Sequence, residues 1–132
     1  MTVAHGAPSA IRYHQKSRVL EVEFDAERTY SMSAEYLRVH SPSAEVRGHG
    51  AGQEVLQVGK EQVAISAIEP VGNYAVKLVY DDGHDSGLYS WEELASLGEK
   101  FDANWANYLE RLAAAGHKRK PQLSVINVTN VS

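Results

Sequence analysis

Hydrophobic and polar residues alternate in the first quarter of the chain. Residues 18–24 place Leu20, Val22 and Phe24 on one side of the backbone and glutamates on the other. This period of two predicts a strand with one buried face. Shorter alternations predict a strand on each side of it, marked by Ile11, Tyr13, Tyr30 and Met32.

The middle of the chain is expected to contain a short helix, a long polar loop and a meander. Ser33 is a favoured helix cap and precedes a predicted helix at residues 34–39. Residues 40–50 are so polar that they predict a loop. Three further strands are predicted, separated by turn sequences, at residues 55–58, 62–68 and 75–80.

The last third has helical periodicity. Ser90 and Glu93 form a capping box that opens a helix expected to end at Gly98. A second helix, expected to stop at Gly116, has one apolar face made of Phe101, Trp105, Tyr108, Leu109 and Leu112. The whole pattern predicts an α+β fold: a curved, mainly antiparallel sheet with short helices packed on it and two C-terminal helices. Trp91 is expected to be buried against the meander.

Length and composition fit one globular domain. The chain has 132 residues, which we assign to one domain at residues 1–120 and a tail at residues 121–132, either disordered or an edge strand. A net charge of −4 without a basic stripe argues against nucleic-acid binding. No apolar run reaches the roughly 18–20 residues of a membrane span, and no signal peptide is recognised, so a cytoplasmic location is expected.

Two polar segments concentrate the candidate chemistry. The first supplies the candidate binding residues Arg38, His40, Glu45, Arg47 and His49. The second supplies Asp82, His84 and Asp85. The arginines suit an anion or a structural carboxylate partner, and histidines with carboxylates suit Fe(II), Zn(II) or Ni(II).

Known catalytic patterns are missing from the sequence. There is no phosphate-binding loop, no nucleophile elbow and no His-x-Asp of the kind that Fe(II) oxygenases use. The chain also has no cysteine, which excludes disulfides and Cys-ligated zinc. No catalytic residue is therefore assigned.

Several longer motifs resemble a known family. The runs SPSAEVRGHG, IEPVGNYAVKL and DDGHDSG and the tripeptide Tyr89-Ser90-Trp91 are similar to the N-terminal domain of gamma-butyrobetaine hydroxylase. Bacteria also make this domain alone, as a small protein of unknown function (DUF971). The resemblance covers roughly residues 11–119.

The resemblance implies a zinc module in the hydroxylases, held by a Cys-x-Cys-x-x-Cys loop and a later histidine. In this chain the cysteine positions are Ser41, Ser43 and Val46, and the histidine is His84. Serine is a poor zinc ligand and valine is none, so no cofactor is predicted. If the fold is shared, residues 40–49 lie beside His84. His40, His49 and His84 can then converge with Asp82 or Asp85 to hold Fe or Zn.

Three functional hypotheses follow. The first is a non-catalytic accessory domain that binds a protein partner. Domains of this family are fused to hydroxylase domains and, in plants, to P-loop iron–sulfur carriers, which implies partners that handle metals. The second is a metal-binding protein that uses His84 and the loop histidines. The third is a small enzyme with an unrecognised site built from His49, His84, Arg47 and Asp85. The oligomeric state is left open.

Overall fold

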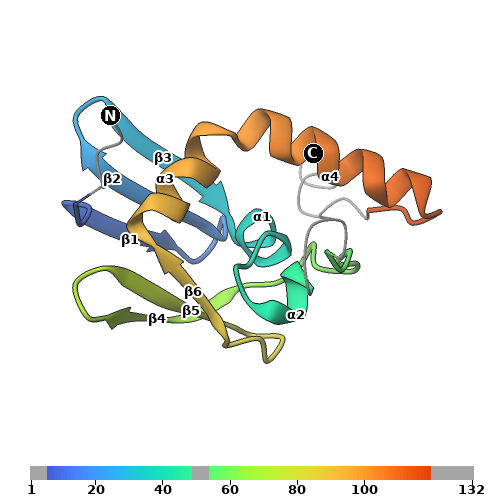
Figure 1. The fold of residues 1–132 in the computed structure, drawn as a ribbon, viewed down its shortest axis with the longest axis horizontal. Coiled ribbons are helices and arrows are strands. Elements are labelled where there is room, and N and C mark those ends of the chain that lie inside the picture. The colour runs from blue at the N-terminus through green and yellow to red at the C-terminus, as the bar shows by residue number, and fades with distance from the viewer. Residues whose placement is uncertain (1–5, 49–53, 120–132) are drawn as a thin grey trace, which may run out of the picture.

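The strands of this protein form two separate three-stranded antiparallel sheets (Figure 1). The computed structural model describes residues 6–48 and 54–119. The first sheet has the order β1-β2-β3, with bounds Ala10–His14, Val19–Asp25 and Arg28–Ser33. The second has the order β4-β5-β6, with bounds Ile65–Val71, Ala75–Tyr80 and Gly87–Ser90. The predicted α+β class is confirmed, with the strands divided between two sheets.

Four helices accompany the sheets, with bounds Ala34–Val39 (α1), Ala44–Arg47 (α2), Trp91–Glu99 (α3) and Phe101–Ala114 (α4). The caps behave as the sequence predicts. The Ser33 hydroxyl accepts a hydrogen bond from the Tyr36 N–H, and Ser90 and Glu93 complete the capping box of α3. Helix α3 contacts β3 of one sheet and β6 of the other, whereas α4 extends away from the sheets past α1 (Figure 1).

Between residues 40 and 90, the structure differs from the predicted elements in two wrong predictions and one unpredicted strand. Residues 55–58 form no strand, because Leu56 packs on α4 and Gln57 bonds to Arg38. The predicted polar loop contains the short helix α2, and strand β6 was not predicted at all. A strand of four residues repeats the pattern of one buried and one more exposed side chain only twice, which is too short a pattern to predict a strand from the sequence. The structure does not describe residues 120–132, so the tail prediction stays a prediction.

Helix α3 runs one residue further than predicted because Gly98 does not end it. The helix ends at Glu99, and Lys100 is the cap. A Cβ built at Gly98 would collide with the ring of Tyr30 in β3. Glycine at this position therefore allows α3 to pack closely on the first sheet. Gly116, in contrast, ends α4 as predicted, with a left-handed φ of 81° directly after the Ala115 cap.

Both sheets and helices α1 and α3 contribute to one hydrophobic core. Its fully buried side chains include Leu20, Met32, Tyr36, Leu37, Leu78, Tyr80, Tyr89 and Leu94. A smaller cluster of Val39, Tyr108 and Leu112 joins α1 to α4. The core therefore lies between the two sheets' inner faces, and α1 links it to α4.

Trp91 is buried as predicted, with 8% of its surface exposed, in the same core cluster as Val76 and Leu78. Its indole N–H also donates to the Asn73 carbonyl at 2.8 Å. We expect Trp91→Ala to lower the free energy of unfolding by about 3–5 kcal/mol, as for other buried aromatic residues. Urea denaturation checks this, with Trp91→Phe as the control that keeps an aromatic ring. Equal stabilities of Trp91→Ala and the wild type would contradict it.

Candidate functional site

The two polar segments lie side by side, as predicted. The Ser41 hydroxyl oxygen is 2.9 Å from Nε2 of His84, and the Ser43 hydroxyl oxygen is 3.4 Å from the same nitrogen. The segments are more than 40 residues apart in the chain, so this contact depends on the tertiary fold. We call Ser41, Ser43, Glu45 and His84 the His84 site.

Tight local turns position the residues of this site. The Ser43 N–H donates to the Ser41 hydroxyl at 3.3 Å, which closes the bend around Pro42 before α2 begins. On the other side, the His84 N–H donates to the Asp82 carboxylate at 3.1 Å, a turn typical of aspartate. Gly83 between them has a φ of 94°, a left-handed conformation that favours glycine.

Both nitrogens of the His84 ring are hydrogen-bonded, and 3% of the side chain is exposed. Nδ1 lies 3.0 Å from a Glu45 carboxylate oxygen. Because a carboxylate only accepts, Nδ1 carries the proton, and Nε2 of the neutral ring accepts from the Ser41 hydroxyl. Ser86 donates to the same Glu45 carboxylate at 3.2 Å. The His84 site therefore satisfies its buried ring with protein groups alone.

The pKa of His84 lies below its ordinary value. Burial is the main cause, because the ring loses the water that would solvate its charged form. The positive charge of Arg38 lowers the pKa further, whereas Glu45 and Asp82 oppose the shift. A neutral ring agrees with the hydrogen-bond directions assigned from the geometry.

A charged network lies next to the His84 site. The Arg38 side chain, nearly buried, donates from Nε to Asp82 at 2.9 Å and from a terminal nitrogen to Gln57 at 3.0 Å. The Lys60 ammonium lies 2.8 Å from the same Asp82 oxygen. Burial by itself would raise the pKa of Asp82. This effect is outweighed by hydrogen bonds from Lys60 and the His84 N–H and by the positive charge of Arg38, so the pKa of Asp82 is lowered to about 2. Arg38 is therefore paired within the protein.

Two buried tyrosines link the site to the core. The Tyr89 hydroxyl donates to the Leu37 carbonyl at 2.6 Å, and the Tyr80 hydroxyl lies 2.7 Å from that of Tyr89. Burial raises the pKa of both, so both stay protonated. A Cβ on Gly87 would lie 2.5 Å from the Ser41 hydroxyl oxygen, so β6 can approach residues 41–43 closely only with glycine there.

In the described part of the chain, the side chains of His40, Arg47 and Asp85 form no hydrogen bond with the His84 ring. The His40 ring bonds to the Tyr36 carbonyl and lies near the Tyr108 ring of α4. Arg47 donates to Glu93 of α3 at 2.6 Å, and Asp85 is exposed without a polar partner in the described part of the chain. His49 lies outside the described residues. Within residues 6–48 and 54–119, the predicted convergence of His40 with His84 is therefore not formed.

The donor atoms at the family's zinc positions do not fit zinc. His84 supplies one nitrogen, Ser41 and Ser43 supply hydroxyls, and Val46 supplies nothing. Zinc sites take thiolate, imidazole or carboxylate ligands, and one imidazole is too few to hold the ion. Among the described residues, no group of three or more His, Asp or Glu side chains is placed to hold one ion.

Ser41, His84 and Glu45 have the hydrogen-bond order of a serine–histidine–carboxylate triad. A nucleophile must also reach its substrate, and Ser41 is only 1% exposed. Its oxygen additionally accepts the Ser43 N–H, and Gly87 packs against it. The arrangement is therefore suited to holding the two segments together, with no room for an acyl group.

Sequence reasoning missed Gln57, Lys60 and Ser86, which complete the charged network and the His84 site. Gln57 and Lys60 lie in a stretch where a strand and a turn were expected, and no local pattern indicates their partners. Ser86 had a signal, because it lies in the DDGHDSG motif two residues after His84.

The chain belongs to the family described as "Gamma-butyrobetaine hydroxylase-like, N-terminal", whose model matches residues 11–95. This finding confirms the resemblance on which the zinc comparison depends. No curated protein matches the chain. In the described part of the chain, no helix is both long and apolar enough to cross a membrane.

Solved structures with the same fold agree with this assignment. Two NMR solution structures are each 50% identical to this chain with a TM-score of 0.76; each alignment covers 92% of this chain, and 96% and 92% of the other chains. A crystal structure from Acidithiobacillus ferrooxidans ATCC 23270 is 35% identical, with a TM-score of 0.60 over 74% of this chain and 98% of that one. That protein belongs to the DUF971 family and is of unknown function.

His84, which is buried, and His40, which is partly buried, predict a pH-dependent stability. Loss of solvation is the largest cause that lowers the pKa of His84 and of His40 in the folded state. The unfolded chain therefore binds protons more strongly than the folded chain. Stability should be complete above the ordinary histidine pKa near 6.5 and decrease as the pH falls below it, by at most about 1.4 kcal/mol per pH unit for each ring. Urea denaturation between pH 7.5 and 5 measures this decrease.

The double variant His40→Gln/His84→Gln should have a shallower pH slope than the wild type, whatever its absolute stability. His117→Gln, which removes an exposed histidine after α4, is the matched control. A wild-type stability that is constant over this pH range would contradict the lowered pKa of both rings.

The donor set also predicts that metal does not hold this corner. Protein purified without added metal should contain less than one zinc per chain, and EDTA should leave the melting temperature unchanged, because hydrogen bonds satisfy His84. Elemental analysis and a thermal melt test both points. The variant Ser41→Cys/Ser43→Cys/Val46→Cys is the positive control and should take up zinc. One zinc or iron per wild-type chain with a chelator-sensitive melt would overturn this prediction.

Proposed function

We propose that this protein is a non-catalytic accessory domain that acts by binding a protein partner, beside proteins that handle metals or iron–sulfur clusters. The observation that carries the proposal is the state of His84. Its two ring nitrogens are hydrogen-bonded to Ser41 and Glu45, and its ring is buried. The part of the chain richest in reactive side chains is thus used for structure.

The neighbouring charges support the same proposal. Arg38 and Asp82 are paired with each other and with Gln57 and Lys60, and Arg47 is paired with Glu93. An anionic substrate would have to compete with these internal partners. The family description names an N-terminal domain of hydroxylase-like proteins, which suits a domain that works beside another protein or domain.

Metal binding through His84 is the weaker alternative. An ion at Nε2 would displace the Ser41 hydroxyl, and an ion at Nδ1 would compete with Glu45. Glu45 is the most open member of the His84 site, with a side chain that is 71% exposed. Elemental analysis of the purified protein separates this alternative from the accessory function.

Affinity purification tests the accessory function directly. The tagged protein is expressed in the cells that normally make it, and captured proteins are quantified by mass spectrometry against a tag-only control. We expect one or a few proteins to be enriched. The variant Ser41→Ala/Ser43→Ala, if shown by NMR to be folded, should capture the same proteins, because these hydroxyls serve the fold.

Two results would count against the proposal. If no protein is enriched over the tag-only control, the partner-binding function is wrong. If the folded Ser41→Ala/Ser43→Ala variant loses a partner that the wild type captures, the His84 site has a direct functional role.

A further inference from the structure

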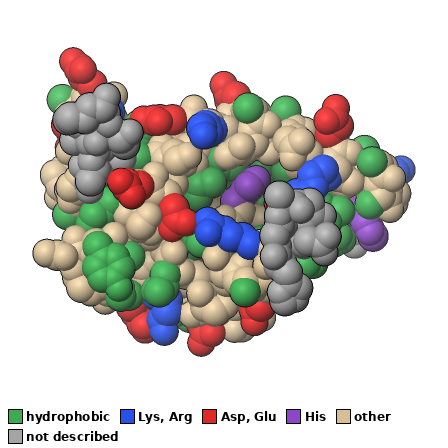
Figure 2. Space-filling model, viewed as in Figure 1, with side chains coloured by type: hydrophobic (Ala, Val, Ile, Leu, Met, Phe, Trp, Pro, Cys, Tyr) green, Lys and Arg blue, Asp and Glu red, His purple; other side chains and the backbone are tan. Residues whose placement is uncertain are grey.

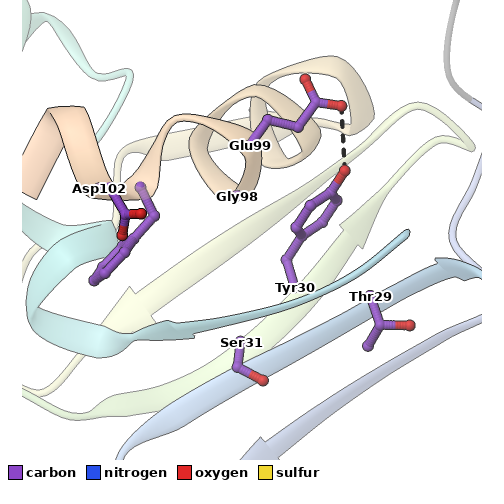
Figure 3. A pocket seen from close by; sticks show the side chains of 7 residues that line it. Thr29, Tyr30, Ser31, Gly98, Glu99 and Asp102 are labelled. Atoms are coloured by element: carbon purple, nitrogen blue, oxygen red, sulfur yellow. Dashed lines mark hydrogen bonds between the residues drawn. The ribbon is translucent and has the colours of Figure 1, made fainter. Parts of the chain in front are cut away.

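A second candidate site lies between β3 and the corner where α3 meets α4 (Figure 3). It is a pocket of about 250 Å³ that shares no residue with the His84 site. Residues 29–31 of β3 form one side. Gly98, Glu99, Phe101 and Asp102 form the other. No sequence motif indicated this pocket, because its two sides lie on elements far apart in the chain.

The lining of the pocket is acidic. It contains the carboxylates of Glu99 and Asp102 and no lysine or arginine. The Tyr30 hydroxyl donates to Glu99 at 3.2 Å, as the dashed line in Figure 3 shows. The side chain of Asp102, an exposed residue, has no hydrogen-bond or ion-pair partner within the part of the chain that the structure describes. Among the described residues, no cationic side chain is paired with either carboxylate of the pocket, so its negative charge is open to a ligand.

Aromatic rings and size narrow the choice of ligand. Tyr30 packs against Gly98, where any side chain would collide with the ring, and Phe101 adds a second ring to the lining. Cations bind to ring faces as well as to carboxylates. The volume is below the roughly 300–1,000 Å³ of pockets that enclose drug-sized ligands, so it suits the end of one side chain.

The position of the pocket at a sheet edge favours a polypeptide ligand. In the order β1-β2-β3, no strand of the described residues pairs with the outer side of β3. Extended peptides bind such edges through main-chain hydrogen bonds and place side chains in adjacent pockets. Asp and Glu side chains are also prominent over the part of the surface in Figure 2 where α3 lies. Together with the net charge of −4, this attracts a basic partner.

We propose that this pocket binds an arginine or lysine side chain of a protein partner, held by Glu99 and Asp102 against the Tyr30 ring. The proposal deepens the accessory function by giving the chemistry of the partner, and it rests on that function for the partner's existence. The planar guanidinium of arginine can bond to a carboxylate through two N–H groups, so arginine is expected to bind more tightly than lysine.

The test uses the intact chain and capped arginine amide as the probe. Backbone amide signals of residues 29–31 and 98–102 are followed by NMR during titration, with capped citrulline amide as the neutral, isosteric control. We expect arginine to shift these signals and citrulline to bind about fivefold more weakly or worse, with the arginine effect reduced by salt.

The variant Glu99→Gln/Asp102→Asn should weaken arginine binding by a similar factor. Glu92→Gln/Glu110→Gln is the matched control. It removes two charges from the same two helices, and Glu92 lies in the first turn of α3 as Asp102 lies in the first turn of α4. Equal binding of arginine and citrulline, or equal binding by the wild type and the pocket variant, would overturn the proposal.

Capture from cells separates this proposal from the accessory function. If the pocket variant captures markedly less partner than Glu92→Gln/Glu110→Gln, the pocket is the docking site. If both capture as much as the wild type, the pocket proposal is wrong and the accessory function stands. If the wild type captures nothing, the accessory function fails, and the pocket proposal fails with it because no partner is present to supply the side chain.

Discussion

The fold at its most polar corner depends on the hydrogen bonds of one buried imidazole. A buried ring with unsatisfied nitrogens is unfavourable, so His84 needs a donor on one side and an acceptor on the other. Ser41 and Glu45 supply them from a segment far away in the chain. This requirement fixes α2 against the turn between β5 and β6. The same turn carries Asp82, which ion-pairs with Arg38 of α1.

The same corner explains how this chain relates to its family. At the positions where the resemblance implies thiolates, Ser41 and Ser43 place hydroxyl groups around Nε2 of His84. The Ser41 hydroxyl forms a direct hydrogen bond of ordinary length to the imidazole, so this bond joins the two segments without a bridging ion. Val46, at the third position, is buried and joins the packing. Hydrogen bonds can therefore hold the same backbone arrangement that thiolates and a metal ion would hold. The polar groups of Ser41, Glu45 and His84 are already bonded to one another in this arrangement.

The acidic pocket is formed by the packing of α3 on β3. Gly98 lets α3 approach β3 until the Tyr30 ring lies against the helix, and the chain then turns into α4. This corner leaves Glu99 and Asp102 beside the outer edge of a sheet. A binding surface at this place needs no catalytic residue, which agrees with an accessory role. It also lies on elements unrelated to the His84 site, so the two can be varied independently in experiments.

The sequence by itself determined many of the local elements, but not α2 or β6. Alternation indicated the first three strands, and short-range hydrogen bonds indicated the caps at Ser33 and Ser90, because these signals involve neighbours within a few residues. The resemblance also placed the two polar segments side by side. Only the tertiary structure decided how the groups are used. The strands divide into two sheets, Arg47 pairs with Glu93 of α3, and His40 lies against α4. These outcomes depend on contacts between residues far apart in the chain, which local periodicity does not encode.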